Sequence, residues 1–215
     1  MGFLSCSYLH FINLLLIMLF TAGSCIAAEP ISCKDPVSSI EQSTKDLMKS
    51  LKSECGSKGK ADVAKVVEKT LIKRLDTEFM VRQILGRKYW EESKNDQRDH
   101  LESLLKSLLS HQYALAFNCQ MLSNKITFYP LREEVKKYTR VESMVQLAEK
   151  QPLQIKYAMR CSEKEWFVYD IIISGLSLGQ TFRSQFNRVL KMGGIEALIS
   201  YIEKELEESG DETHH

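Results

Sequence analysis

The segment at residues 166–186, WFVYDIIISGLSLGQTFRSQF, contains the pattern that decides the fold. Its first part, WFVYDIII, has apolar side chains at both sets of alternating positions, which predicts a β-strand covered on both faces. GLSLG follows at residues 175–179, a G-x-S-x-G, and apolar residues at helical spacing come next. A strand, this motif and a helix are the context in which α/β-hydrolases place a nucleophilic serine. Ser177 is therefore a candidate nucleophile, and a secreted serine hydrolase is one hypothesis for the function.

The positions of the histidines argue against catalysis by Ser177. In hydrolases with this motif, the acid and the histidine follow the serine along the chain. Here the histidines after Ser177 are His214 and His215, at the C-terminus, whereas His100 and His111 lie upstream on one predicted helix. We therefore expect the hydroxyl of Ser177 to cap the helix that follows it.

Asp170 is a carboxylate inside the apolar strand. A buried carboxylate in a cleft can serve as a general acid, but we expect Asp170 to pair with Arg183 on the next helix. The sequence contains no H-E-x-x-H, P-loop or dinucleotide-binding motif. We therefore predict a protein that is not an enzyme and that holds neither a metal nor a cofactor.

Apolar residues recur at helical spacing before and after a central region in which they alternate. The helical pattern covers residues 36–52, 61–75, 76–86, 95–117, 178–191 and 195–206. The alternating pattern covers residues 125–131, 136–147, 153–160 and 166–173. Gly86 is expected to end the third helix. Helices, then a run of strands, then helices predict an α+β domain with an antiparallel sheet.

The N-terminus resembles an export signal. Residues 11–20 are apolar and are followed by small residues, which predicts a signal peptide removed after Ala27 or Ala28. One domain at residues 29–208 and a disordered tail at 209–215 would remain. The alternative is a lipoprotein signal, with the protein anchored through Cys25. A net charge of +1 without a basic stripe excludes nucleic acid as an expected partner.

Four cysteines remain after residue 28, namely Cys33, Cys55, Cys119 and Cys161. In an oxidising compartment an even number favours disulfides. Cys33 and Cys55 flank a predicted helix ~24 Å long, so they can meet within ~7 Å only if that helix breaks or its flanks fold back. Cys119 and Cys161 can pair if the strands beside them are neighbours. The sequence leaves the pairing open, and without C-x-x-C it predicts no zinc ribbon or thioredoxin-type site.

Three blocks of the sequence resemble the MlaC family, the toluene-tolerance-type periplasmic phospholipid carriers. They are DTEFMVRQILGRKYW (76–90), QRDHLESLLKSLLSHQYALAF (97–117) and VYDIIISGLSLGQTFRSQF (168–186). The family pattern has valine at the position of Leu176 and Asn-Tyr at Thr181-Phe182. It does not reserve the position of Gly179 for glycine, so the G-x-S-x-G is explained as the result of one substitution.

The resemblance implies a strongly curved antiparallel sheet of about four to five strands, packed with N-terminal and C-terminal helices around an apolar cavity. It implies a monomer in the periplasm of a Gram-negative bacterium, with phospholipid as its cargo and no cofactor. Its partners would be an outer-membrane lipoprotein complex and an inner-membrane ABC transporter with a lipid-binding ring subunit. The implied role is intermembrane lipid transport that maintains outer-membrane asymmetry, with the protein as an auxiliary of the transporter.

Acyl chains need a protein carrier because their exposure to water is unfavourable. Two acyl chains contain about 30 methylenes, and at ~0.8 kcal/mol each their exposure to water costs about 25 kcal/mol. We expect the acyl chains to contact the inward side chains of the strands and neighbouring helices, although a register slip of one residue would invert each strand. The expected lining consists of Leu85, Tyr113, Phe128, Val145, Ile155, Tyr157, Tyr169, Ile171, Ile173, Leu176, Leu178, Phe182 and Phe186.

Overall fold

The structure is a computed structural model that describes residues 33–56, 63–114, 119–147 and 151–211. All of these residues belong to one unit, Ile31–His215. The predicted signal peptide, Cys25 and the last four residues of the predicted tail lie outside the described residues. None of the described helices combines the length and the apolar character needed to cross a membrane.

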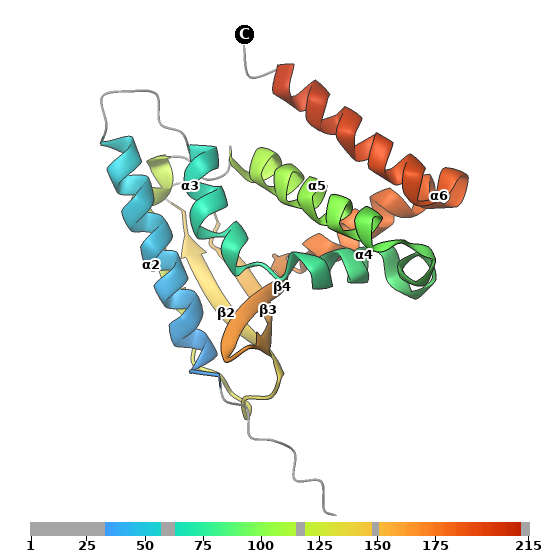
Figure 1. Cartoon of the computed structure of the whole chain (residues 1–215). Helices are drawn as coiled ribbons and strands as arrows, with labels where there is room; N and C mark the ends of the chain where they lie inside the picture. Colours follow the sequence, from blue (N-terminus) through green and yellow to red (C-terminus); the bar gives the residue numbers. More distant parts are fainter. Residues whose placement is uncertain (1–32, 57–62, 115–118, 148–150, 212–215) are drawn as a thin grey trace, which may run out of the picture. The chain divides into compact units, whose positions relative to one another are not determined.

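Helices flank a central run of strands, as the change of periodicity predicts (Figure 1). The elements before the sheet are α2 (Pro36–Cys55), α3 (Val63–Thr70), the 3₁₀ helix η1 (Ile72–Arg74), α4 (Thr77–Glu92), α5 (Asn95–Ala114) and the 3₁₀ helix η2 (Cys119–Ser123). The sheet and the last helix are β1 (Lys125–Phe128), β2 (Tyr138–Gln146), β3 (Leu153–Ser162), β4 (Glu165–Ile173), β5 (Leu176–Ser177) and α6 (Leu178–Asp211). The α+β class is therefore confirmed.

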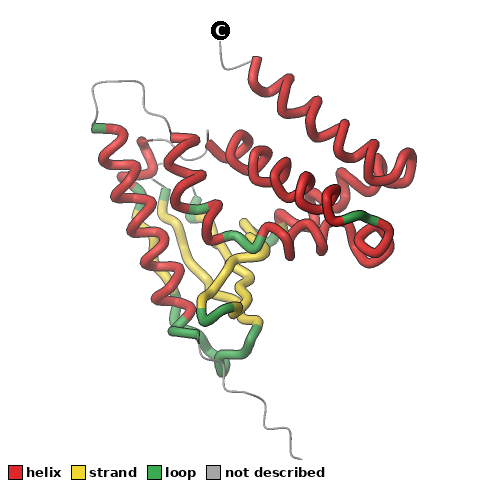
Figure 2. The backbone as a smooth tube through the Cα atoms, viewed as in Figure 1, coloured by secondary structure: helices red, strands yellow, loops and turns green. Residues whose placement is uncertain are grey.

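The five strands form one antiparallel sheet in the order β1-β2-β3-β4-β5. Figure 2 shows the strands as one group of neighbouring segments, with the helices outside them. Two tight turns join its last strands: Glu163-Lys164 with φ of 52° and 67°, and Ser174-Gly175 with φ of 49° and 89°. Positive φ at both central residues matches the twist of a hairpin. The second turn leads into β5. The sequence pattern does not predict this strand, because only two residues of GLSLG belong to it.

The pairing of β3 with β4 contains a bulge. Ala158 lies opposite Asp170 and Met159 lies opposite Val168, so Tyr169 is an extra residue in β4. An extra residue on one strand reverses which face the following side chains occupy. The prediction that β4 is covered on both faces agrees with the structure only in part, because Trp166 and Val168 are buried, whereas the residues from Tyr169 to Ile173 are half-buried.

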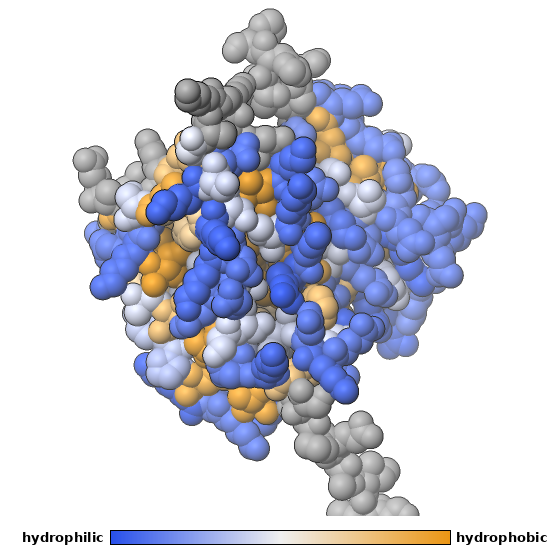
Figure 3. All heavy atoms as spheres, turned by 60° about the vertical axis from the view of Figure 1, so that its left-hand side comes forward, coloured by the Kyte–Doolittle hydropathy of each residue, from blue (hydrophilic) through white to orange (hydrophobic). Residues whose placement is uncertain are grey.

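Helix α2 is amphipathic and lies against the sheet. Asp35 caps it by accepting from the backbone N–H of Ser38 at 2.7 Å, and Pro36 occupies the first turn. Ile40, one of its buried residues, packs with Val141 of β2. Figure 3 shows the side of the molecule on which α2 lies, where hydrophilic side chains cover most of the surface between smaller hydrophobic patches.

Two glycines interrupt the helices that contain them. Gly86 has φ 69° and ψ 172°, which is not helical, so the helical segment predicted at 76–86 ends there and a second segment of α4 continues to Glu92. A Cβ at Gly86 would lie 2.9 Å from Nη2 of Arg183, which together with the positive φ explains the glycine. Gly194, with φ 69°, separates the two predicted C-terminal helices within α6. That helix extends to Asp211, three residues into the predicted tail at 209–215.

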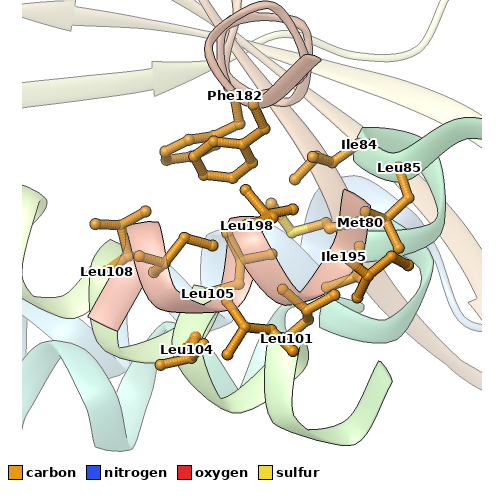
Figure 4. Close-up of a cluster of buried hydrophobic side chains, with 14 of the residues drawn as sticks. Met80, Ile84, Leu85, Leu101, Leu104, Leu105, Leu108, Phe182, Ile195 and Leu198 are labelled. Carbon is orange, nitrogen blue, oxygen red and sulfur yellow. The ribbon is translucent and has the colours of Figure 1, made fainter. Parts of the chain in front are cut away.

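The buried apolar residues form three separate clusters. The largest, which we call the helical cluster, joins α4, α5 and α6 (Figure 4). The second joins α2 to one face of the sheet, and the third joins α2 to α3. Leu75 is half-buried and contacts both the helical cluster and the second cluster. Most domains have one contiguous core, so the division leaves the sheet and the helical cluster as distinct packing units.

Both disulfides attach α2 to other parts of the fold. Cys33 pairs with Cys161 of β3, and Cys55 pairs with Cys119 of η2, with Cα–Cα distances of 6.0 and 5.9 Å. Neither pairing considered from the sequence forms. Helix α2 is unbroken over 20 residues, so Cys33 and Cys55 stay at its opposite ends.

Candidate functional site

One row of residues crosses the whole sheet on a single face. Phe128 pairs with Ser143, Ser143 with Ile155, Ile155 with Ile173, and Ile173 with Leu176. Directly paired residues of antiparallel strands project to the same side. The row is therefore apolar in each of the five strands except β2.

Two further rows lie beside the first on the same face. One joins Val141, Tyr157 and Ile171, and the other joins Ile126, Val145 and Leu153. We call these three rows the apolar face of the sheet. The hydroxyl of Ser143, in the first row, donates to the hydroxyl oxygen of Tyr157 at 3.3 Å. Both polar groups of this region are thereby paired, as buried hydroxyls require.

The apolar face is covered unevenly. Under α2, Val141 and Ser143 are fully buried. Ile155 of β3 and Ile173 of β4 are only half-buried, and Leu176 of β5 is 75% exposed. Helix α2 contacts β2, whereas η1, α4 and α6 contact β4. Met159, Trp166 and Val168 are buried on the same face. The least covered part of the face is therefore the end that carries Ile155, Ile173 and Leu176.

Most of the strand residues expected to line the site share this face. They are Phe128, Val145, Ile155, Tyr157, Ile171, Ile173 and Leu176. Tyr169 is the exception, because the bulge in β4 shifts it out of phase with Ile171. The side chain of Tyr113, in the last turn of α5, lies outside the described part of the chain.

The helical residues expected to line the site lie in the helical cluster. Leu85 and Phe182 are 5% and 3% exposed, and Figure 4 shows Phe182 extending from α6 toward the side chains of the other helices. Phe186 stacks on Phe182, with ring centroids 5.6 Å apart, and Leu178 is half-buried against the same cluster. These side chains pack against one another, and their contact with a ligand stays a prediction.

Tyr169 belongs to a group of aromatic side chains whose contacts the sequence pattern does not predict. Its ring lies 5.1 Å from Phe79 and 6.1 Å from Tyr138, and the guanidinium of Arg160 lies 5.0 Å from the ring of Phe79. Arg160 also forms an ion pair with Asp76, the residue that caps α4. Desolvation raises the pKa of the Tyr169 hydroxyl, and the charge of Arg140 opposes that rise. The group joins α4 to the sheet.

The opposite face of the sheet forms an open groove of about 1190 Å³. We call it the polar groove because Arg140, Glu142 and Lys156 line it. These residues alternate along β2 and β3 with members of the apolar face. Lys156 Nζ lies 3.0 Å from Glu142 Oε1. The lining also includes apolar side chains such as Met144 and Ile172. Acyl chains bound here would remove the charged groups from water, and such groups then need partners.

Ser177 caps α6. Its hydroxyl accepts from the N–H of Gln180 at 3.0 Å and donates to Oδ2 of Asp170 at 2.6 Å. The N–H of Gly179 donates to Oδ1 of Asp170 at 2.9 Å. The capping prediction is confirmed, and a carboxylate at a helix N-terminus is favourable. This arrangement commits the hydroxyl of the G-x-S-x-G to the helix end.

Arg183 does not pair with Asp170, so that prediction is wrong. Its Nη1 donates to the backbone oxygen of Gln83 at 3.2 Å, across the kink of α4. His100, considered as a catalytic partner of Ser177, lies 2.8 Å from Glu203. In the part of the chain that the structure describes, no group of metal-ligating side chains is present.

Comparisons with known proteins identify a family and a solved structure with a similar fold. The family described as MlaC protein matches residues 41–204. No curated protein matches the chain. Among solved structures, the chain resembles the phospholipid-binding protein from Ralstonia solanacearum, determined in complex with a phospholipid at 1.53 Å, with a TM-score of 0.71 and 24% identity. The likeness covers 82% of this chain and 99% of that protein and shows that the two share a fold.

Proposed function

The chain belongs to the MlaC family, and from this premise we propose that it binds phospholipid and shields the acyl chains from water. The proposal is supported by the solved structure with the same fold, which was determined with a phospholipid bound. It assigns a ligand to a sheet face to which each of the five strands contributes apolar residues.

The observation that carries the proposal is the incomplete burial of this face. Ile155, Ile171 and Ile173 are half-buried, although each belongs to a residue type that is usually buried. Burying a side chain of this size contributes ~1.5–3 kcal/mol, so partial exposure of a row of them is unfavourable without a ligand. Acyl chains bound to these residues would remove from water both the isoleucine side chains and the acyl chains themselves.

The separate clusters allow such a ligand to enter. The helical cluster packs without the side chains of Ile155 and Ile173, and the cluster under α2 does not include them either. A ligand can therefore contact Ile155 and Ile173 without disrupting either cluster. The polar groove is also large, but Arg140, Glu142 and Lys156 would lose contact with water if acyl chains filled it, so the apolar face is the more favourable site.

We further propose the family's role for this chain: carriage of phospholipid across the periplasm between an outer-membrane lipoprotein complex and an inner-membrane ABC transporter with its ring subunit. The two disulfides support an oxidising compartment. Water between the membranes makes a carrier necessary, because unshielded acyl chains would cost about 25 kcal/mol.

The experiment is transfer of phospholipid from vesicles of dioleoyl phosphatidylethanolamine and dioleoyl phosphatidylglycerol, followed by native mass spectrometry of the re-isolated protein. We expect a mass increase equal to whole phospholipid molecules, lost on denaturation. Ile155→Glu places a charge on the apolar face and should abolish the increase. Gln154→Glu, the next residue of the same strand but on the polar groove, should retain it. Wild-type protein that stays free of lipid would refute the proposal.

A further inference from the structure

Along the first row of the apolar face, burial is complete at β2 and decreases toward β5. Ser143 of β2 is fully buried, Ile155 and Ile173 are half-buried, and Leu176 of β5 is 75% exposed. A single exposed leucine needs no explanation. Leu176, however, continues a row of apolar residues that leads from solvent to the interior, because it pairs with Ile173, which pairs with Ile155.

Two disulfides hold α2, the helix that covers the β2 part of the row. Cys33 ties the residues before α2 to β3, and Cys55 ties the last residue of α2 to η2, which directly precedes β1. The indole N–H of Trp166 in β4 also donates to the backbone oxygen of Lys34. The two disulfides and this hydrogen bond restrict the movement of α2 away from β2, which makes entry under α2 unfavourable.

The β4–β5 hairpin, in contrast, is exposed to solvent. Strand β5 lies at the edge of the sheet and pairs only with β4. Ser174, Gly175 and Leu176 are exposed, and a Cβ added to Gly175 would meet no atom within 4 Å. This edge therefore has both the apolar contact and the free space that an entering chain needs.

We propose that the β4–β5 hairpin is the mouth of the lipid site, where acyl chains of a phospholipid first contact Leu176 and then pass along Ile173 to Ile155. This inference rests on the proposed function and specifies its route of entry. The chains enter at the edge opposite α2, and α2 serves as the fixed wall of the site.

The test measures how fast the protein takes up dioleoyl phosphatidylglycerol labelled on one acyl chain from vesicles. Leu176→Ser should slow uptake about tenfold, the effect of losing one leucine contact at the entry step. Met192→Ser is the matched control, because Met192 is 79% exposed but lies on α6, and its uptake rate should equal that of wild type. The amount of lipid bound at equilibrium should change less than the rate for Leu176→Ser.

A second pair of variants locates the chains directly. Phospholipid with brominated acyl chains should quench the added fluorescence of Leu176→Trp and leave that of Met192→Trp unchanged. If wild type takes up lipid while Leu176→Ser does so at the wild-type rate and Leu176→Trp is not quenched, the hairpin is not the mouth, and the proposed function stands. If wild type takes up no lipid, the proposed function fails and the route fails with it.

Discussion

The helical cluster and the apolar face of the sheet use the same kinds of side chain in different ways. In the helical cluster, Leu101, Leu105 and Leu198 are each 1–2% exposed and pack against side chains from neighbouring helices. On the apolar face, Ile155 and Ile173 are half-buried and belong to no cluster. Residue type is therefore the same in the two regions, and the degree of burial differs.

The largest expected effect concerns the wall formed by α2. Replacing Cys33 and Cys161 by serine should reduce the free energy of unfolding by about 4 kcal/mol, since this disulfide closes a long loop. The two disulfides span sequence separations of 128 and 64 residues. A variant that keeps only Cys33–Cys161 should therefore be about 0.6 kcal/mol more stable than one that keeps only Cys55–Cys119. Denaturation in urea measures both differences, and equal stability of all variants would show that α2 is not held by these bonds.

Truncation in the helical cluster should mainly reduce stability, whereas truncation on the apolar face should mainly reduce lipid binding. Leu198→Ala removes a side chain that is 1% exposed and should cost about 3 kcal/mol of unfolding free energy. Ile173→Ala should cost only about 1 kcal/mol, because its side chain is half-buried. Urea denaturation of the lipid-free protein gives these values.

The same pair of variants is then compared by lipid uptake from vesicles. Ile173→Ala should bind less phospholipid than wild type, and Leu198→Ala should bind a normal amount wherever it is folded. A stability loss for Ile173→Ala as large as that for Leu198→Ala would place the apolar face in the packed core.

A smaller effect is expected at the turn that begins α6. Ser177→Ala removes the cap of the helix and should lower stability by about 1 kcal/mol. The control is Gly179→Ala, which breaks the G-x-S-x-G but adds a Cβ at an ordinary 3.4 Å from Asp170 Oδ1; it should be nearly neutral. Stability is read from thermal unfolding. Reaction of Ser177 with a fluorophosphonate would contradict the structural role.

The smallest effect is a dependence of stability on alkaline pH. Burial raises the pKa of the Tyr157 hydroxyl, and its hydrogen bond with Ser143 opposes that rise. The folded state thus favours the neutral hydroxyl. This contribution to stability is complete below the unfolded pKa of about 10 and is lost as pH rises through the folded value.

Tyr157→Phe should therefore make unfolding less dependent on pH above about 10. Tyr129→Phe, at a residue that is 42% exposed, is the control and should retain the wild-type profile. Unfolding followed at a series of pH values distinguishes the two, and identical profiles for all three proteins would contradict burial of Tyr157 on the apolar face.

Periodicity was sufficient to predict most elements and the grouping of most strand residues. Alternation along β3 places Ile155 and Tyr157 on one face, and the antiparallel register extends that face to Ile171 and Ile173. Tyr169 was assigned to the same face because a bulge leaves no mark in the alternation of side chains. Strand β5 was missed because two residues are too few for a periodic signal.

The sequence pattern does not predict which helices and strands pack against each other. The spacing of Phe182 and Phe186 predicts an apolar side of α6 but not whether that side meets the sheet or the helical cluster. The pairing of Cys33 with Cys161 likewise depends on where α2 lies, and so does the partner of Arg183. Local pattern fixes which side chains point the same way, whereas their partners are fixed by the packing of distant segments.

The central claim is that acyl chains occupy the apolar face, and photocrosslinking tests it most directly. A phospholipid with a diazirine at the end of one acyl chain is loaded from vesicles and irradiated, and the modified residues are identified by peptide mass spectrometry. The account predicts modification at Ile155, Ile171 or Ile173 of the apolar face. Modification confined to residues of the polar groove, such as Arg140 or Lys156, would contradict it.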